Sequence, residues 1–284
     1  MPYSYRSLTA CLEKAGVDEP AAEASLLLEH FAGAGRASLM TDRDRLWDAP
    51  GLDAAVIRRT EREPLQYILG EWEFFGCRFE VDRHCLVPRP DTEVLVETAI
   101  RTLPPRAHAV DLCTGSGCIA VSLLVNRPDV AAEALELYPE TLGLAERNAV
   151  RNRVSDRFRP VCADLLSPDG LNSLLPYAPY DAILSNPPYI PTDVIPSLSP
   201  EVQKEPRAAL DGGADGLTFY RTILRDYAPL VKPGGLILLE MGYDQADALR
   251  RLAAELLPRA RVEILCDLGG NFRVTKITLP DMPA

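Results

Sequence analysis

The tetrapeptide Asn186-Pro187-Pro188-Tyr189 follows a run of β-forming residues at 181–185 and has the clearest chemical meaning in the sequence. Two consecutive prolines fix the backbone and remove two N–H donors, so the neighbouring carbonyls are held rigidly and point outward. The Asn186 side chain adds an oxygen acceptor beside the Pro187 carbonyl, and such a pair can hold an –NH2 group by its two hydrogens. The Tyr189 ring offers a face to a planar group. The segment therefore predicts a site for a planar amino or amide group.

A glycine-rich loop lies between an expected strand at 109–112 and an expected helix that starts at Gly117. Glycines allow a ligand to approach the backbone closely, and free N–H groups at the start of a helix face an anionic or polar ligand. The spacing Gly115-x-Gly117-x-x-Ala120 also satisfies the dinucleotide fingerprint, so the loop alone leaves the identity of the cofactor open. The candidate cofactor-binding residues of the loop are Asp111, Cys113, Thr114, Gly115, Ser116 and Gly117.

Acidic residues stand at the ends of three expected strands, Asp111 at the first, Glu136 at the second and Asp164 at the third. The carboxyl ends of parallel strands meet at one edge of a sheet, so these side chains are expected to line that edge. Glu136 lies about 20 residues after the loop, where a carboxylate can accept both hydroxyls of a ribose. Any one of these acidic residues could simply lie in a solvated loop. That explanation is weaker for three acidic residues that stand at the ends of three strands.

Strand and helix signals alternate after residue 89, which is typical of a doubly wound α/β sheet. Further strands are expected at 131–137, 158–162 and 236–239, and a helix is expected through Leu142, Ala145 and Ala149. The last two expected strands, 262–265 and 272–279, leave no room for a helix between them. We therefore expect this final pair to be antiparallel.

The first 71 residues carry helical periodicity and almost no strand signal. Apolar residues recur at helical spacing from Leu8 and again from Ala24, so we expect a small helical bundle at 1–71. Strand-forming residues around Gly76 predict a linking β-hairpin at 72–88. The chain then breaks at a proline pair, and Asp91 or Thr92 is expected to cap a helix that opens the catalytic domain, 89–284.

Composition argues against several classes of protein. Thirty Lys and Arg against 41 Asp and Glu give a net charge of −11, which disfavours nucleic acid as a direct partner. No apolar run is long enough for a membrane span and the N-terminus does not resemble a secretory signal, so we expect a cytoplasmic protein without membrane attachment. The seven cysteines are scattered without metal-ligand spacing, and no metal site is expected. The histidines at 30, 84 and 108 lie outside the predicted site.

Taken together, these motifs resemble the HemK/PrmC family, the release factor glutamine N(5)-methyltransferases. The resemblance covers nearly the whole chain from about Pro64 to Thr278, while the helical N-terminal part agrees in type only. The segments that carry it, besides the glycine loop and the Asn186 tetrapeptide, are Pro64-Leu-Gln-Tyr-Ile-Leu-Gly70, Phe74-Phe-Gly76, Leu86-Val-Pro-Arg-Pro-Asp-Thr-Glu93 and Glu205-Pro-Arg-Ala-Ala-Leu-Asp-Gly-Gly213. The sequence departs from the usual bacterial pattern at Cys113, Cys118 and Met241.

This resemblance implies S-adenosylmethionine as cofactor, a seven-stranded class I methyltransferase domain and the glutamine of a release factor Gly-Gly-Gln motif as substrate. Because the helical bundle is a separate unit without a cofactor motif, we expect it to recognise that protein. In this arrangement Asn186 and the Pro187 carbonyl position the amide nitrogen, and Asn186 also adjoins the cofactor. The methionine carboxylate is expected over the amides of 114–117, Glu136 holds the ribose, and Asp164 with Leu165 borders the adenine.

Three alternatives use parts of the same pattern. An adenine amino-methyltransferase acting on nucleic acid shares the Asn186 tetrapeptide, but the acidic chain lacks the phosphate-binding charge that such an enzyme needs. A nicotinamide-dependent oxidoreductase shares the glycine loop, but it leaves that tetrapeptide unexplained. A family relative acting on an amino or amide nitrogen of another protein or a small metabolite stays open.

Overall fold

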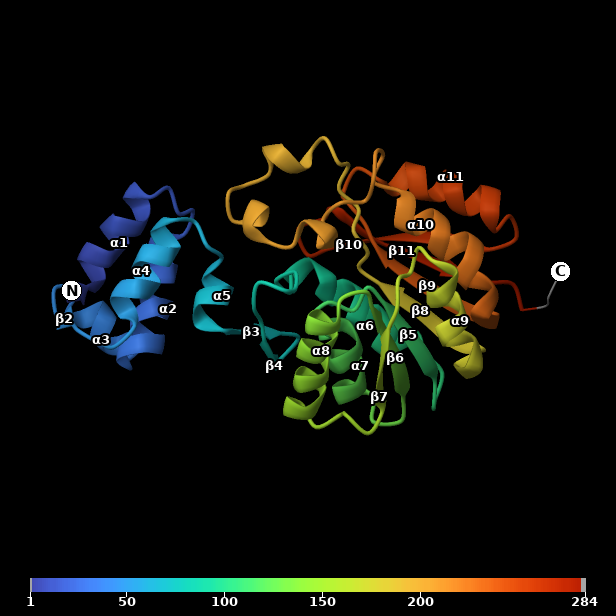
Figure 1. The fold of residues 1–284 in the computed structure, drawn as a ribbon, viewed down its shortest axis with the longest axis horizontal. Helices are drawn as coiled ribbons and strands as arrows, with labels where there is room; N and C mark the ends of the chain where they lie inside the picture. Colours follow the sequence, from blue (N-terminus) through green and yellow to red (C-terminus); the bar gives the residue numbers. More distant parts are fainter. Residues whose placement is uncertain (1, 282–284) are drawn as a thin grey trace. The chain divides into compact units, whose positions relative to one another are not determined.

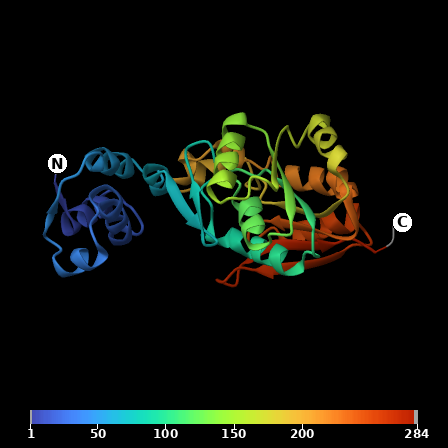
Figure 2. The same cartoon turned by 90° about the horizontal axis from the view of Figure 1, so that it is seen from below.

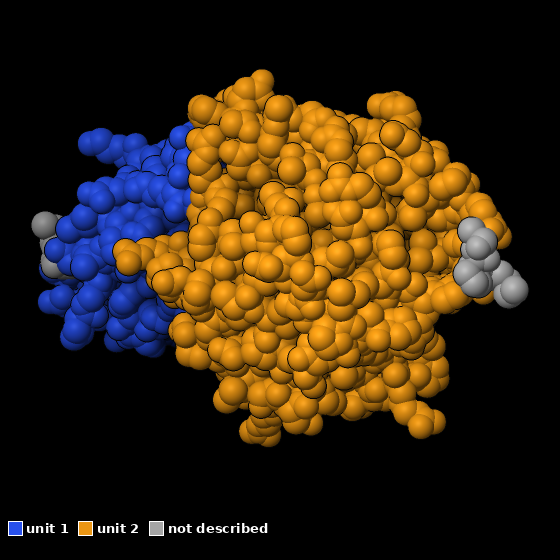
Figure 3. Space-filling model, turned by 45° about the vertical axis from the view of Figure 1, so that its right-hand side comes forward, with its two compact units in different colours: residues 1–71, 198–205 blue, residues 72–197, 206–284 orange. Residues whose placement is uncertain are grey.

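The computed structural model describes residues 2–281, and its chain divides into two compact units. Unit 1 runs through Glu71 and also contains Leu198–Glu205, and unit 2 contains Trp72–Ser197 and the chain from Pro206 onward. Figure 3 colours the two units. The segment Leu198–Glu205 is a part of unit 1 that sequence analysis had placed with residues 89–284.

Unit 1 is a helical bundle, as predicted. Its helices are α1 (Tyr5–Lys14), α2 (Pro20–Ala32), α3 (Arg36–Thr41), α4 (Leu52–Thr60) and α5 (Leu65–Leu69). Ser4 begins α1 with a capping box, accepting a hydrogen bond of 3.1 Å from the Ser7 backbone N–H. Leu8 and Leu12 of α1 pack with Leu27 and Leu28 of α2, which confirms both predicted apolar stripes. A two-residue pairing of β1 (Tyr3–Ser4) with β2 (Leu46–Trp47) was not predicted.

Ion pairs with Glu201 hold Leu198–Glu205 within unit 1. Arg59 Nη1 lies 2.9 Å and Arg62 Nε 2.5 Å from Glu201 Oε1, and Arg59 also pairs with Glu23. The Arg59 side chain is only 4% exposed, so its buried positive charge must be stabilised by these carboxylates. Nothing local in the sequence reveals this connection, because its partners are more than 130 positions apart.

We expect Arg59→Leu to lower the free energy of unfolding by about 3 kcal/mol, because it leaves Glu23 and Glu201 facing each other without their shared cation. Urea denaturation followed by circular dichroism measures this change. Arg58→Leu is the matched control on the same helix, since the Arg58 side chain is 44% exposed in its pair with Glu63 and should contribute less than about 1 kcal/mol. Equal losses in both variants would contradict the role given to Arg59.

Unit 2 is built on a seven-stranded sheet (Figure 1) with the order β10-β11-β9-β8-β5-β6-β7. Its strands are β5 (His108–Leu112), β6 (Ala131–Glu136), β7 (Phe158–Cys162), β8 (Tyr180–Ser185), β9 (Val231–Glu240), β10 (Arg261–Cys266) and β11 (Phe272–Thr278). Strands β5 to β9 are mutually parallel, and β11 runs antiparallel to both of its neighbours. The predicted doubly wound sheet with an antiparallel last strand is confirmed.

Helices cover both faces of this sheet (Figures 1 and 2). One face packs against α6 (Glu93–Thr102), α7 (Cys118–Asn126) and α8 (Pro139–Arg151), and the other packs against α9 (Pro168–Leu174), α10 (Thr218–Thr222) and α11 (Ala246–Leu256). Successive residues of β8 alternate between the two cores: Ala182 and Leu184 enter the first, and Ile183 enters the second. Since both faces are covered, the central strands read as continuous apolar runs.

The predicted linking hairpin consists of β3 (Glu71–Phe74) and β4 (Cys77–Glu80). Phe75 and Gly76 both have positive φ, at 50° and 71°, as a two-residue type I′ turn requires. Among residues 2–281, no helix is both long and apolar enough to cross a membrane.

The remaining short helices are η1 (Pro90–Thr92), η2 (Leu175–Tyr177), η3 (Ile195–Ser197), η4 (Val202–Lys204), η5 (Arg207–Ala209), η6 (Ile223–Tyr227) and η7 (Ala228–Leu230). Helix α6 begins directly after Thr92, where a capping residue was predicted. The expected side-chain cap is wrong, however, because neither candidate caps the helix. Asp91 instead pairs with Arg273 at 3.1 Å, and the Thr92 hydroxyl bonds to Asn186.

Candidate active site

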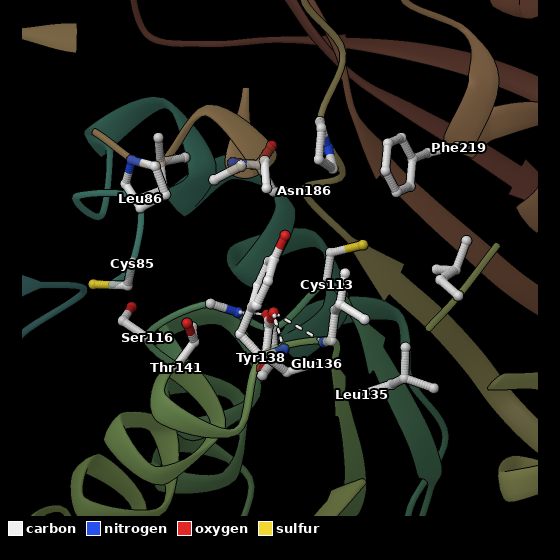
Figure 4. A pocket seen from close by; sticks show the side chains of 18 of the residues that line it. Cys85, Leu86, Cys113, Ser116, Leu135, Glu136, Tyr138, Thr141, Asn186 and Phe219 are labelled. Atoms are coloured by element: carbon white, nitrogen blue, oxygen red, sulfur yellow. Dashed lines mark hydrogen bonds between the residues drawn. The ribbon is translucent and has the colours of Figure 1, made fainter. Parts of the chain in front are cut away.

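A cavity of about 390 Å³ opens at the carboxyl edge of the central strands of unit 2. Its size lies within the range of small-molecule sites. The predicted site residues that line it are Cys113, Thr114, Gly115, Ser116, Glu136, Asp164, Leu165, Asn186 and Pro188. Figure 4 shows the Glu136 carboxylate with its hydrogen bonds and Asn186 in the same pocket. Residues that follow four different strands are thus brought together.

The Glu136 carboxylate is held by backbone N–H groups from two segments. Its Oε2 accepts from Gly115 at 3.0 Å, and its Oε1 accepts from Leu137 at 2.9 Å and from Tyr138 at 3.3 Å. Burial raises the pKa of Glu136, while these donors favour the ionised form. A carboxylate has about four acceptor sites, so roughly one is left for a ligand hydroxyl rather than the two expected from sequence.

The loop amides are used differently from the prediction. Thr114 N–H donates to the Leu135 carbonyl at 3.0 Å, and Gly117 N–H donates to the Thr114 carbonyl at 2.9 Å. With Gly115 N–H bound to Glu136, three of the amides expected to face a ligand carboxylate are already occupied within the protein. The sequence could not reveal this because the acceptors include the neighbouring strand β6.

Gly117 and Asp111 support the loop from behind and do not line the pocket. At Gly117 the φ is +79°, and an added Cβ would lie 3.1 Å from the Ala145 Cβ, so glycine permits close packing against α8. Asp111 is fully buried and accepts from the Thr114 hydroxyl at 2.6 Å and from the Ala120 N–H at 3.3 Å. Burial raises the pKa of Asp111 to about 7. Their predicted direct contact with the cofactor stays a prediction.

Within the tetrapeptide, Asn186 and Pro188 line the pocket and Pro187 and Tyr189 do not. Tyr189 packs against the apolar core beneath α10 and α11, and burial raises the pKa of its hydroxyl. Its predicted contact with the substrate stays a prediction. The Asn186 Nδ2 donates to the Thr92 hydroxyl at 3.3 Å, which leaves the amide oxygen as the acceptor on its other side.

The backbone beside this tetrapeptide is paired with a segment that sequence analysis noted only for its resemblance. Ile190 N–H donates to the Leu210 carbonyl at 2.9 Å, and Gly212 N–H donates to the Ile190 carbonyl at 2.8 Å. Ile190 and Asp211 form a parallel bridge. The motif through Gly213 therefore braces the Asn186 tetrapeptide, and Asp211 and Gly213 also reach the pocket.

Several pocket residues carried no signal from the local sequence. They come from the segment after the hairpin, from the start of α8 and from α10, and comprise Leu86, Val87, Arg89, Thr92, Tyr138, Thr141 and Phe219. Leu86 to Thr92 belong to a motif that was quoted for resemblance only. Phe219 could have been found only from the fold, because an aromatic residue on a helix face is usually core, and Tyr138 is placed at the pocket by its position just before α8.

A parallel sheet with one antiparallel strand at the end of the chain, a glycine loop after β5, an acid after β6 and the Asn186 tetrapeptide after β8 define a class I S-adenosylmethionine-dependent methyltransferase. Residues 5–70 match the model of the PrmC N-terminal domain, and residues 90–211 match that of the methyltransferase small domain. The chain is 42% identical over 242 residues to a release factor glutamine methyltransferase of Geobacter sulfurreducens, covering 84% of this chain and 82% of that protein.

A second relative extends the match to nearly full length. The chain is 40% identical over 281 residues to a release factor glutamine methyltransferase of Cereibacter sphaeroides, covering 97% of both chains. The chain belongs to the release factor glutamine methyltransferase family. The fold alone is shared with the hMettl16 catalytic domain, at 17% identity and a TM-score of 0.56, over 84% of this chain and 85% of that one.

The pocket residues fit S-adenosylmethionine, the cofactor of this enzyme class. Glu136 combines burial with a free acceptor site, as a ribose hydroxyl requires. Asp164 and Leu165 line the next part of the wall and are proposed to border the adenine. The apolar residues Cys113, Leu135 and Ala163 provide further surface for a flat base.

We expect Glu136→Ala to weaken binding of S-adenosylmethionine by roughly 1.5 to 3 kcal/mol, the scale of a hydrogen bond to a charged group. Isothermal titration calorimetry measures the dissociation constant. Glu140→Ala, at an exposed position in the first turn of α8, is the control and should bind as the wild type does. An unchanged dissociation constant for Glu136→Ala would show that the ribose is held elsewhere.

Proposed function

We propose that this protein transfers a methyl group from S-adenosylmethionine to the side-chain amide nitrogen of a glutamine in a peptide-chain release factor, in its Gly-Gly-Gln motif. The observation that carries the proposal is the placement of Asn186 in the pocket with its amide oxygen free to accept a hydrogen bond. Family membership supports the same reaction, since the relatives named above are release factor glutamine methyltransferases.

An amide nitrogen is a poor nucleophile because its lone pair is delocalised into the carbonyl. S-adenosylmethionine supplies an electrophilic methyl group on a sulfonium. We propose that the Asn186 oxygen, which lines the pocket, and the Pro187 backbone carbonyl, which lies between the pocket residues Asn186 and Pro188, accept the two amide hydrogens of the substrate. These two hydrogen bonds orient the substrate nitrogen toward that methyl. As positive charge develops on the nitrogen, these two fixed dipoles stabilise it. The proton released after transfer is acidic and passes to water, so no strong base is required.

We further propose that unit 1 recognises the folded release factor, whereas unit 2 binds the cofactor. The match of residues 5–70 to the PrmC N-terminal domain and the absence of pocket residues from the described part of unit 1 support this division. Basic residues at Arg36, Arg43 and Arg45 give unit 1 candidate contacts for a partner. The cytoplasm is the proposed location, because release factors act during translation.

The test is mass spectrometry of a purified release factor after incubation with the enzyme and isotopically labelled S-adenosylmethionine. We expect one labelled methyl group on the glutamine of the Gly-Gly-Gln motif. A short peptide with the same motif is assayed in parallel and should react much more slowly at equal concentration, because it lacks the surface for unit 1. Absence of label on the intact protein would overturn the proposed substrate, and equal rates for peptide and protein would overturn the role of unit 1.

A further inference from the structure

Three polar side chains from three separate elements form a chain that starts at the pocket wall, with Asn186 and Thr92, and continues to the buried Glu240. Asn186 follows β8, Glu240 ends β9, and Thr92 ends η1. Strands β8 and β9 are parallel neighbours with Ser185 paired to Leu239, so Asn186 and Glu240 leave the sheet at the same level. Thr92 connects them: its hydroxyl lies 3.3 Å from Asn186 Nδ2, and its side chain bonds to the Glu240 carboxylate.

Thr92 and Glu240 are each only 1% exposed. One carboxylate oxygen of Glu240, Oε2, has no hydrogen-bond partner among the residues that the structure describes. Burying a carboxylate with so few donors is unfavourable. Such an arrangement destabilises the fold, and a buried carboxylate with a raised pKa beside a pocket is a candidate for a role in that site.

The direction of the hydrogen bonds in this chain follows from the number of hydrogens available. An ionised carboxylate only accepts, so Thr92 donates its single hydroxyl hydrogen to Glu240. Thr92 can then only accept from Asn186, which must present its –NH2 group to the hydroxyl. The Asn186 amide oxygen is thereby turned away from Thr92, toward the pocket that Asn186 lines.

We propose that Thr92 and Glu240 are positioning residues that fix the orientation of the Asn186 amide, so that its oxygen faces the substrate. This proposal rests on the proposed function for the identity of the substrate, but the orientation of Asn186 is a property of the enzyme alone. We call the hydrogen-bonded pair of Thr92 and Glu240 the relay. Without it the Asn186 side-chain amide can rotate by half a turn and present its –NH2 group where the substrate needs an acceptor, since the oxygen and the –NH2 group of an amide are nearly equal in size.

The charge of Glu240 links this relay to pH. Burial raises the pKa of Glu240 to about 7, while the Thr92 hydrogen bond and the nearby Arg273 and Arg89 oppose the rise and Asp91 adds to it. When pH falls through that value Glu240 gains a proton and can donate to Thr92, which frees the Thr92 hydrogen to turn toward Asn186. Correctly oriented Asn186, and with it turnover, is therefore expected above about pH 7 and is lost below it.

The experiment compares Thr92→Val, which keeps the shape and removes the hydroxyl, with Thr92→Ser, which keeps the hydroxyl. Against a release factor at saturating S-adenosylmethionine we expect Thr92→Val to lower kcat about 10- to 50-fold, the effect of a misplaced group in an active site. Thr92→Ser should stay within about threefold of wild type, and the dissociation constant for S-adenosylmethionine should change less than about threefold in both. Thermal unfolding confirms that both variants are folded.

Two further readouts separate a positioning role from other roles. Combined with Asn186→Ala, Thr92→Val should cause no additional loss, because it acts only through Asn186. Below pH 7 the activity of the wild type should fall more steeply than that of Glu240→Gln, which has no carboxyl group to titrate, whereas the share of the fall that comes from Asp111, whose pKa burial also raises to about 7, should stay in both. Additive losses in the double variant, or weakened cofactor binding with kcat unchanged in Thr92→Val, would overturn the relay.

A measurement without substrate keeps this proposal distinct from the proposed function. Side-chain amide signals of Asn186 are assigned in 15N NMR spectra by comparison with Asn186→Ala, and their exchange with water is followed. Exchange should be slow in the wild type and at least about tenfold faster in Thr92→Val, since its hydrogen-bond acceptor is gone. Equal exchange rates would overturn the relay, whereas failure to methylate a release factor overturns only the proposed substrate.

Discussion

Replacing Asn186 with Ala is expected to lower turnover on a release factor by about 10² to 10³, comparable to the loss of one preorganised hydrogen-bonding group in an active site. The Asn186 oxygen is the polar side-chain atom that the tetrapeptide brings to the pocket, since Pro188 has none and Tyr189 packs into the core. Water that enters the vacated space is mobile, so it cannot hold the substrate amide in a fixed orientation as the Asn186 oxygen does.

The loss in Asn186→Ala should appear in kcat, with binding of S-adenosylmethionine weakened much less, because the surfaces proposed for the ribose and the adenine lie at the pocket residues Glu136 and Leu165. Single-turnover kinetics with labelled cofactor separate the two quantities. Asn172→Ala, at an exposed position in α9, is the matched control and should keep the wild-type rate. Wild-type turnover in Asn186→Ala at saturating substrate would show that the tetrapeptide is only a rigid turn. The main support for amide methylation would then be lost.

Local signals were sufficient for most strands of unit 2 and for the helical character of unit 1. The strands β7 (Phe158–Cys162) and β8 (Tyr180–Ser185) were predicted to within one residue, and β8 has the apolar run Ala182–Leu184 at its centre. The antiparallel end of the sheet followed from a connection too short for a helix, which forces a hairpin between β10 and β11. These features depend on neighbours in sequence.

Features that depend on contacts between distant residues were not predicted. Thr92 has the side chain of a helix cap, but the fold brings Glu240 and Asn186 to its hydroxyl and the cap is left unmade. The Thr92 side chain had two uses compatible with its type, and tertiary contacts selected the one that the local sequence did not favour.

The same dependence on distant contacts makes Gly212 a sensitive position. A Cβ added at Gly212 would lie 2.7 Å from the Tyr189 Cα and 2.8 Å from the Tyr189 carbonyl carbon, closer than such atoms can approach. Both contacts are backbone, so no side chain can swing aside. The hydrogen bonds between Ile190 and the chain at Leu210 and Gly212 hold the two backbones together, so relief requires the Asn186 tetrapeptide itself to shift.

We therefore expect Gly212→Ala to lower kcat about 10²-fold through a displacement of Asn186 by a fraction of an ångström to 1 Å, without removing any functional group. Gly143→Ala in α8 is the matched control, because the nearest atom to an added Cβ there is Arg147 Nη1 at 3.8 Å, and the change should leave activity intact and stabilise the helix slightly. Enzyme assays and thermal unfolding of both variants measure these effects. Full activity in folded Gly212→Ala would show that the position of the tetrapeptide tolerates such a shift, and that the close backbone contact at Tyr189 serves packing rather than the placement of Asn186.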